Sequence, residues 1–324
     1  MDELNLIRKP VEQELGDYRR LFEETLTHED DFLGRALSYI RTRTGKMMRP
    51  LLVLLVAKEL GEVNASTLRS AVTLELLHTA SLVHDDVVDE SDERRGQASA
   101  NAVYGNKVAV LVGDYLLSGA LHQSVLTGSL ECVDIIARLG GTLSEGEVRQ
   151  LANIRKEEAS EDAYFSVIQR KTAALFAACA KLGAITGGGT REFVDAAEDL
   201  GNYIGVCFQI RDDIFDYYED SKIGKPTGND MIEGKLTLPV IYALRTADNA
   251  EMNAIALKVK RGEVTKGEIS RLVEFTKENG GVDYAREVME NYREKAIHCL
   301  ESFKNGEIKE ALTRYVDFVI GRSL

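Results

Sequence analysis

Residues 66–90 read STLRSAVTLELLHTASLVHDDVVDE, and this stretch decides the fold. Apolar side chains recur on every turn and around most of the circumference, which is typical of a helix buried in a protein core. The stretch ends in three aspartates. A second long apolar helix is predicted over residues 191–218, and it carries aspartates at the same end. We therefore expect two central helices that each present carboxylates at one end.

The rest of the chain also favours helices. Of its 324 residues 44% are hydrophobic and 29% charged, which is the balance of a folded globular protein. Only 4 are prolines, so long helices can run uninterrupted. No segment alternates as a strand does, and residues 160–183 predict one continuous helix. We expect a single all-α domain over residues 1–324, with the more charged C-terminal helices packed outside the core.

Composition and charge disfavour several classes of protein. The formal net charge of −13 disfavours nucleic-acid binding, which needs a basic surface. The four cysteines form no CxxC pair, so neither a zinc site nor a disulfide framework is predicted. The N-terminus lacks the apolar segment of a signal peptide, and the run at 51–57 is far shorter than the roughly 20 residues that span a bilayer. We expect a soluble cytoplasmic protein without a transmembrane segment or a nucleic-acid partner.

Both groups of aspartates follow the pattern DDxxD. Residues i and i+4 lie about 40° apart around a helix, so Asp85 and Asp89 point the same way, as do Asp212 and Asp216. Like charges this close repel each other. One such group taken alone is usually a solvated helix end, but two on buried helices indicate a cation between them. Carboxylates with few histidines or cysteines nearby suit Mg²⁺, which shares its shell with substrate phosphates.

Basic residues accompany these carboxylates along the chain. Lys171 is the most informative, because its neighbours Ala173 and Leu175 are buried types and a lysine among them needs an anion or a cavity. The other candidates are Lys46, Arg49, Arg94, Arg95, Lys225 and Lys235. Taken singly, each is most simply a surface charge. Together with metal ions on the aspartates, they describe a diphosphate site in a helical cavity.

In these segments the sequence resembles the polyprenyl synthetase family of trans-isoprenyl diphosphate synthases. The resemblance covers essentially the whole chain, with the family's motifs in the family's order. These motifs are GKxxRP at 45–50, ELLHTASLVHDDVVDESDERRG at 75–96, QRKT at 169–172, FQIRDDIFD at 208–216 and GKPTGNDMIEGKLTLP at 224–239. The resemblance implies the isoprenoid synthase fold, a bundle of mostly antiparallel helices around a deep central cavity, and a homodimer.

The resemblance also implies an activity, the head-to-tail condensation of isopentenyl diphosphate with an allylic diphosphate. Carried over by position, Mg²⁺, as three ions per site with substrate bound, would be held by Asp85, Asp89, Asp212 and Asp216. The allylic diphosphate would be bound by Arg94, Lys171, Thr172, Gln209, Lys225 and Lys235, and isopentenyl diphosphate by Lys46, Arg49, His78 and Arg95. The catalytic group would be Asp85, Asp89, Asp212 and Lys171. One departure is Met47, where many members have arginine.

Product length depends on the residues that precede the first motif on its helix. In the family that this chain resembles, bulky aromatics four or five positions before the motif close the tunnel and stop chain growth. Here Ala80 and Ser81 are small, with Leu77 one turn deeper. We expect growth past fifteen carbons, to a long-chain, octaprenyl-type tail of a quinone. A farnesyl- or geranylgeranyl-length product is the alternative, because another helix could cap the tunnel.

Four other functional interpretations of the sequence account for fewer of these residues. An HD-type phosphohydrolase would use His84-Asp85 but needs further histidines and leaves the second DDxxD unexplained. A ferritin-like di-iron protein needs two ExxH motifs, and only residues 75–78 match. A class I terpene cyclase would leave the isopentenyl diphosphate-binding set idle. An inactive regulatory subunit typically loses aspartates, and all six are present.

Overall fold

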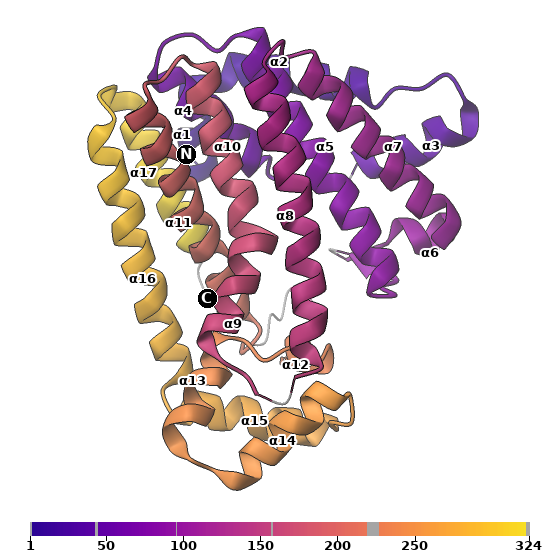
Figure 1. Ribbon diagram of the computed structural model, residues 1–324, viewed down its shortest axis with the longest axis vertical. Helices are drawn as coiled ribbons and strands as arrows, with labels where there is room; N and C mark the ends of the chain where they lie inside the picture. The colour runs from indigo at the N-terminus through magenta and orange to yellow at the C-terminus, as the bar shows by residue number, and fades with distance from the viewer. Residues whose placement is uncertain (1, 43–44, 95, 157, 219–226, 322–324) are drawn as a thin grey trace. The chain divides into compact units, whose positions relative to one another are not determined.

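The computed structural model describes residues 2–42, 45–94, 96–156, 158–218 and 227–321, and these form a largely helical structure (Figure 1). The first helices are α1 (Glu3–Arg8), α2 (Glu12–Thr25), α3 (Asp31–Arg41), α4 (Met48–Glu59), α5 (Ala65–Val88), α6 (Ala100–Tyr104), α7 (Asn106–Val125) and α8 (Leu130–Ile154). They are followed by α9 (Glu161–Ile168), α10 (Ala174–Thr186), α11 (Arg191–Phe215), α12 (Asn229–Ile232), α13 (Leu238–Ala247), α14 (Ala250–Arg261), α15 (Lys266–Glu278), α16 (Gly281–Cys299) and α17 (Gly306–Ile320). Short 3₁₀ turns lie at η1 (Lys9–Val11) and η3 (Leu300–Ser302), and η2 (Gln169–Ala173) is a π-helical turn.

Strand structure in the described ranges is limited to one two-residue hairpin. Its strands β1 (Glu93–Arg94) and β2 (Gln97–Ala98) are antiparallel, with Glu93 opposite Ala98. The prediction of an all-α protein is therefore confirmed.

The chain forms two compact units, each assembled from separate segments. Unit 1 comprises residues 1–140, 175–201 and 299–315, and unit 2 comprises residues 141–174, 202–298 and 316–324. The prediction of a single domain over 1–324 stays a prediction.

Unit 1 is built around α4 and α5. Residues 50–57 of α4 are all buried, and Pro50 lies in the first helical turn, where its missing N–H is not needed. The side chain of Asn64 caps the start of α5 by accepting a hydrogen bond from the backbone N of Thr67 at 3.0 Å. α5 packs against α4 and, side by side in Figure 1, against α7. The predicted helix over 66–90 is thus confirmed as α5.

Within the described residues, α7 is the one helix long and apolar enough to cross a membrane by length and composition. About 39% of its apolar window is buried inside the protein. Core helices of proteins that do not span a membrane meet the same criterion, so this single helix is weak evidence for a membrane span.

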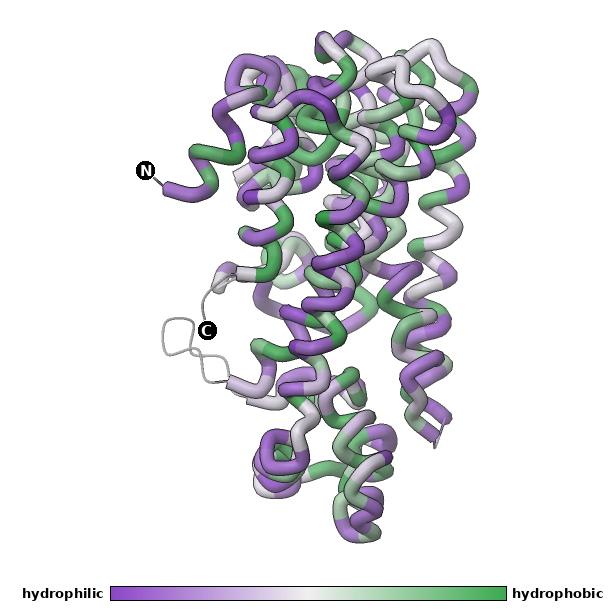
Figure 2. Tube along the Cα trace, turned by 90° about the vertical axis from the view of Figure 1, so that its left-hand side faces the viewer, coloured by the Kyte–Doolittle hydropathy of each residue, from purple (hydrophilic) through white to green (hydrophobic). Residues whose placement is uncertain are grey.

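Unit 2 has its own buried core, to which α9, α11 and the helices α13 to α16 contribute. α14 and α15 pack against each other through amphipathic faces, and Figure 2 shows hydrophobic and hydrophilic residues interleaved within the helices. Thr265 and Glu268 form a reciprocal capping box that starts α15. The helix predicted over 160–183 differs from the structure, because the π-helical turn η2 separates α9 from α10. Such turns are frequent at functional sites.

Close contact between α10 and α11 in unit 1 depends on Gly201. A Cβ atom at this position would lie 2.3 Å from the carbonyl oxygen of Phe176, which is closer than any Cβ contact can be. Gly201→Ala should therefore lower the free energy of unfolding by roughly 1–3 kcal/mol, because backbone must move apart to admit the methyl group. Thermal or urea unfolding measures the change.

Gly16→Ala is the matched control for this substitution. Gly16 lies inside α2 with open space around its added Cβ, so alanine there should be neutral or stabilising by up to about 1 kcal/mol. Equal effects of the two substitutions would refute the close-approach argument.

Candidate active site

The first DDxxD motif lies at the end of α5 and divides its aspartates between two directions. Asp86 is buried and accepts a hydrogen bond at 2.6 Å from the Nε of Arg94 in β1. Asp85 is half-buried, and Asp89, the C-terminal residue that closes α5, is exposed. The middle aspartate therefore ties the β1–β2 hairpin to the helix, while the outer two stay accessible.

The second motif, at the end of α11, shows the same division. Asp213 is buried and accepts hydrogen bonds from the hydroxyl of Tyr164 at 2.6 Å and from Nε2 of Gln209 at 2.8 Å. Burial raises the pKa of Asp213 well above its usual range, and the negative charge of Asp230 raises it further. The side chain of Asp212, by contrast, is 44% exposed.

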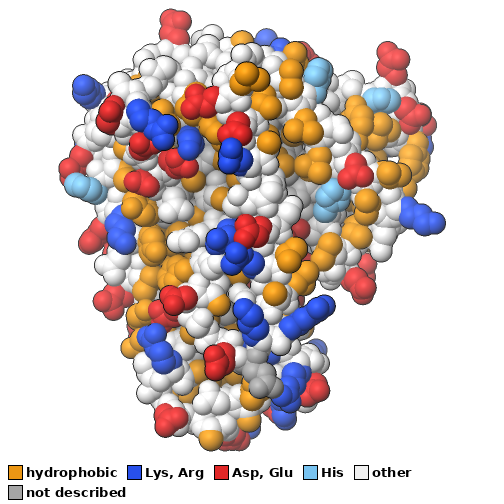
Figure 3. Space-filling model, in the orientation of Figure 1, with side chains coloured by type: hydrophobic (Ala, Val, Ile, Leu, Met, Phe, Trp, Pro, Cys, Tyr) orange, Lys and Arg blue, Asp and Glu red, His pale blue; other side chains and the backbone are white. Residues whose placement is uncertain are grey.

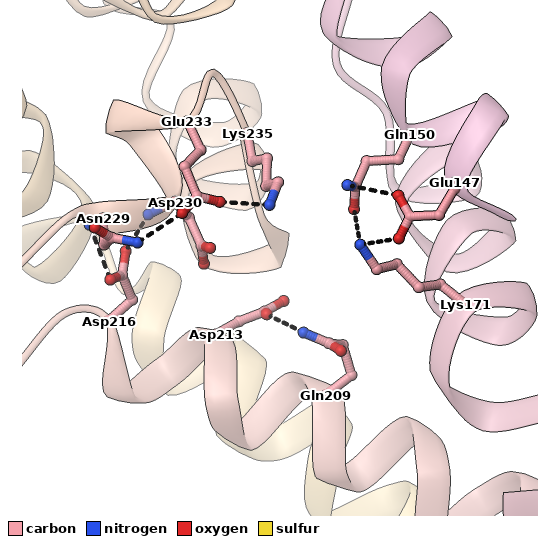
Figure 4. A network of polar contacts seen from close by, with 10 residues as sticks. All are labelled: Glu147, Gln150, Lys171, Gln209, Asp213, Asp216, Asn229, Asp230, Glu233 and Lys235. Atoms are coloured by element: carbon pink, nitrogen blue, oxygen red, sulfur yellow. Dashed lines mark hydrogen bonds and ion pairs between the residues drawn. The ribbon is translucent and has the colours of Figure 1, made fainter. Parts of the chain in front are cut away.

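Asp216 has a structural role that its position in the motif did not predict. Its two carboxylate oxygens accept hydrogen bonds from the backbone N of Asn229 at 2.9 Å and of Asp230 at 3.1 Å. It thereby fixes the segment that carries Lys235 (Figure 4). Burial raises the pKa of Asp230 to about 7, with the charge of Asp216 adding to the shift and that of Lys235 opposing it.

A hollow of about 840 Å³, counting its open mouth, lies within unit 2. Its lining includes four of the predicted allylic diphosphate residues: Lys171, Thr172, Gln209 and Lys235. The hydroxyl of Thr172 donates to Oε1 of Gln209 at 2.8 Å. Apolar side chains line the rest of the wall, among them Val167, Ile168 and Ile241. The structure thus brings cationic, amide and hydroxyl groups from three separate segments into one partly apolar pocket.

Two of the three lysines that line this pocket, Lys171 and Lys235, are paired with glutamates of unit 2 (Figure 4). The third, Lys260, donates to the backbone carbonyls of Lys156 and Glu158. The ammonium of Lys171 forms an ion pair with Glu147 of α8 and a long hydrogen bond, 3.4 Å, with Oε1 of Gln150. Lys235 is paired with Glu233 at 2.5 Å. The prediction that Lys171 needs an anion or a cavity is confirmed, and it has both. Sequence reasoning missed Glu147 and Gln150, whose spacing of three marks a shared helix face but not which face points inward.

The segment 45–50 is held in unit 1 by other arginines. Arg8 donates from Nη2 to the carbonyl of Lys46 at 2.7 Å, and Arg19 donates from Nε to Sδ of Met47 at 3.4 Å. The guanidinium of Arg49 lies 5.0 Å from the ring centre of Phe176. His78 lies on α5 about two turns before Asp85, close to the same face of the helix. Unit 1 therefore carries Lys46, Arg49 and His78 on the packed helices α4 and α5 or just before them.

Three predicted diphosphate-binding residues, Arg94, Arg95 and Lys225, are not among the described residues that line the pocket of unit 2. Arg94 belongs to unit 1, where it is bound to Asp86. Lys225 and Arg95 lie outside the described residues.

Comparisons with known proteins show the family of this chain. A family model described as polyprenyl synthetase matches residues 30–276. The chain belongs to the polyprenyl synthetase family. It is 36% identical over 307 residues to an octaprenyl diphosphate synthase of Haemophilus influenzae, covering 94% of this chain and 93% of that protein. Members of this family transfer prenyl groups, and the chain is accordingly a prenyltransferase.

Solved structures of relatives share the fold. One is a geranylgeranyl pyrophosphate synthase from Bacteroides thetaiotaomicron, with 48% identity, a TM-score of 0.88 and coverage of 99% of this chain and 100% of that one. Another is a polyprenyl synthase from Caulobacter crescentus CB15 complexed with calcium and isoprenyl diphosphate, with 31% identity, a TM-score of 0.92 and coverage of 99% and 98%. The isoprenoid synthase fold implied by the sequence is confirmed.

The donor groups of the acidic motifs fit a hard divalent ion. Among the described residues, no group of three or more His, Cys, Asp or Glu side chains converges into a closed metal cage. Mg²⁺ does not need one, because it is usually held by one or two carboxylates together with water and substrate phosphates. In unit 1, the accessible Asp85 and Asp89 meet that requirement. In unit 2, Asp212 is exposed, with its Oδ1 paired with Arg211, and the oxygens of Asp216 accept hydrogen bonds from backbone N–H groups.

The three residues predicted to set product length lie on α5. Ala80 is fully buried and Leu77 is nearly so. Ser81 is half-buried, and its hydroxyl donates to the carbonyl of His78 at 2.9 Å. Their effect on product length stays a prediction.

The hydroxyl of Tyr164 is the direct support of Asp213. Tyr164→Phe should lower the free energy of unfolding by roughly 1–3 kcal/mol, because it leaves one oxygen of a buried carboxylate without its donor. Tyr284→Phe is the control: its hydroxyl donates to Glu161 at 2.9 Å, but its ring is only half-buried, so a loss below about 1 kcal/mol is expected. Urea unfolding of both variants measures the difference, and equal losses would contradict a special role for Tyr164.

Proposed function

We propose that this chain is a Mg²⁺-dependent trans-polyprenyl diphosphate synthase that condenses isopentenyl diphosphate head to tail with an allylic diphosphate. One observation carries the proposal: Lys171, Thr172, Gln209 and Lys235 line a single pocket of unit 2, beside the end of α11 that bears the second DDxxD motif. A pocket lined mostly by helices, with three lysines and adjacent carboxylates, suits a phosphorylated substrate that arrives with metal ions. We propose that one catalytic domain over residues 1–324 performs the reaction.

The proposed roles follow the family's motifs. The allylic diphosphate is bound by Arg94, Lys171, Thr172, Gln209, Lys225 and Lys235. Isopentenyl diphosphate is bound by Lys46, Arg49, His78 and Arg95. Three Mg²⁺ ions would be held by Asp85, Asp89 and Asp212 together with the allylic diphosphate, and Asp216 would contribute through the lone pairs that its two backbone hydrogen bonds leave open.

In the proposed reaction the allylic C–O bond breaks and its electron pair leaves with the diphosphate. Bound Mg²⁺ supplies charge neutralisation for that leaving group. Lys171 and Lys235 stabilise the same negative charge, and the oxygens of Thr172 and Gln209 direct their dipoles toward the allylic cation. The double bond of isopentenyl diphosphate then forms the new C–C bond, and a proton lost to the departed diphosphate restores a double bond.

We propose a long-chain product of the octaprenyl type, for a quinone tail. Small residues at 80 and 81 and the octaprenyl diphosphate synthase relative at 36% identity support it. A geranylgeranyl-length product is a second candidate, favoured by the 48% identical geranylgeranyl pyrophosphate synthase.

We also propose that the protein is a cytoplasmic homodimer. Apolar side chains gather on the exposed side of α7 (Figure 3). Among them Leu111 is 66% exposed and Val125 62% exposed. An apolar helix face exposed in this way is typical of a surface that another protein covers, and a second copy would bury it in a symmetric contact.

Incubation with labelled isopentenyl diphosphate, an allylic primer and Mg²⁺ tests the function. Elongated prenyl diphosphates support the synthase, whereas free phosphate, cyclised hydrocarbon or no product would indicate a phosphohydrolase, a terpene cyclase or an inactive subunit.

Asp85→Ala and Asp212→Ala should each lower turnover by roughly 100-fold or more, because each removes a ligand of the metal ions that neutralise the leaving group. Asp134→Ala, which removes an exposed aspartate paired with Arg138, is the control and should retain full turnover. Near-normal activity of either active-site variant would remove that residue from the metal site.

Product length is tested by Ala80→Phe. A phenyl ring at this buried position should block the space below the first motif and shorten the products by one or more five-carbon units. Since the ring can also disturb packing, thermal unfolding should accompany chromatography of the products. Ser81→Phe, at the half-buried neighbour, provides a second variant. An unchanged product distribution in both folded variants would place the length limit elsewhere.

A further inference from the structure

Lys171 is held in an unusual local structure. It lies in the π-helical turn η2, which shifts the side chains that follow it relative to a continuous α-helix. Its side chain is only 27% exposed. An ammonium group this enclosed needs a close negative partner, and α8 supplies it.

Lys171, Glu147 and Gln150 form a closed triangle of polar contacts (Figure 4). Glu147 forms an ion pair with Lys171. Gln150 accepts from the same ammonium through Oε1 and donates from Nε2 to Oε2 of Glu147 at 3.3 Å. The side chain of Glu147, like that of Lys171, is only 27% exposed, so water screens this pair less than a surface pair.

Gly146 allows this triangle to form. A Cβ atom at Gly146 would lie 2.9 Å from the backbone N of Lys171 and 3.1 Å from Cβ of Arg170. Only glycine lets α8 come this close to η2. The close approach places the next residue, Glu147, beside the ammonium that faces the pocket.

We propose that Glu147 sets the affinity of the site for diphosphate by competing with it for Lys171. The inference rests on the proposed function, in which Lys171 binds a diphosphate. A phosphate oxygen of the allylic diphosphate and the Glu147 carboxylate compete for the same ammonium, so the allylic diphosphate binds at the expense of the Glu147 contact, and Glu147 regains the ammonium when diphosphate leaves. The carboxylate thereby weakens substrate binding and speeds release of the diphosphate product.

A purely positioning role for Glu147 predicts the opposite change in diphosphate affinity. If Glu147 only positioned Lys171 for the substrate, removing its charge would weaken diphosphate binding. If Glu147 competes, removing its charge while keeping its shape should strengthen binding. The substitution Glu147→Gln therefore distinguishes a competing role from a positioning role.

Calorimetric titration with inorganic diphosphate and Mg²⁺ is the primary measurement. Glu147→Gln should bind inorganic diphosphate about tenfold more tightly than the unaltered protein, as expected when a competing charge contact of ordinary strength is removed. In the condensation assay it should lower KM for the allylic substrate and lower the inhibition constant for inorganic diphosphate. A positional role would raise both.

Glu145→Gln is the matched control. Glu145 lies on the same helix two residues earlier, is half exposed and pairs with Arg149 at 2.6 Å rather than with Lys171. It makes the same change in net charge without touching the triangle, so its diphosphate affinity should match that of the unaltered protein. A similar gain in affinity for Glu145→Gln would reduce the effect to net charge and overturn the proposal.

Thermal unfolding checks that each variant is folded. Should Glu147→Gln not fold, Glu147→Asp keeps the charge but withdraws it by one methylene, and it should also strengthen diphosphate binding, by less than tenfold. Unchanged or weaker binding in the folded variant overturns the proposal while the synthase function stands. No binding of inorganic diphosphate to the unaltered protein, together with no elongated product, overturns both.

Discussion

A carboxylate that folding removes from water must receive hydrogen-bond donors, and this requirement organises both acidic motifs. Asp86 receives the guanidinium of Arg94, and Asp213 receives the hydroxyl of Tyr164 and the amide of Gln209. Because positions one apart on a helix differ by about 100°, turning the middle aspartate into the protein turns its neighbour away from it. One buried residue in each motif therefore sets the direction of the accessible carboxylates. The two motifs use different donors for the same purpose.

The pocket lysines follow a related rule. In a chain of net charge −13, Lys171 and Lys235 are each satisfied by a glutamate of their own unit before any ligand enters. In the proposed site an incoming anion would exchange partners with these lysines and would not simply add a contact. The affinity of such a site is a difference between two sets of interactions, and the carboxylates that face the lysines contribute to it as directly as the lysines do.

Relatives with one fold carry names that denote products of different length, octaprenyl in one case and geranylgeranyl in another. In the proposed reaction the acidic motifs and the lysines serve every condensation and so would not select a length. The proposed determinant of length is the space beneath the first motif. A small residue such as Ala80 on α5 leaves room there but does not create a tunnel, because close packing of the surrounding side chains can fill the same volume.

The sequence by itself determined most of the helices, because they follow from local periodicity, and it located both DDxxD motifs at helix ends. It also indicated that Lys171, among apolar neighbours, needs an anion. It did not identify Glu147, Gln150 or Tyr164 as the partners, the π-helical turn at η2, or the capping of residues 229 and 230 by Asp216. These depend on which faces of helices from separate segments meet, and on how closely a residue such as Gly146 lets them approach. Only the packing of the folded chain decides which side chains meet. Contacts between residues far apart in the sequence produce no periodic pattern along the chain, so the sequence alone does not reveal them.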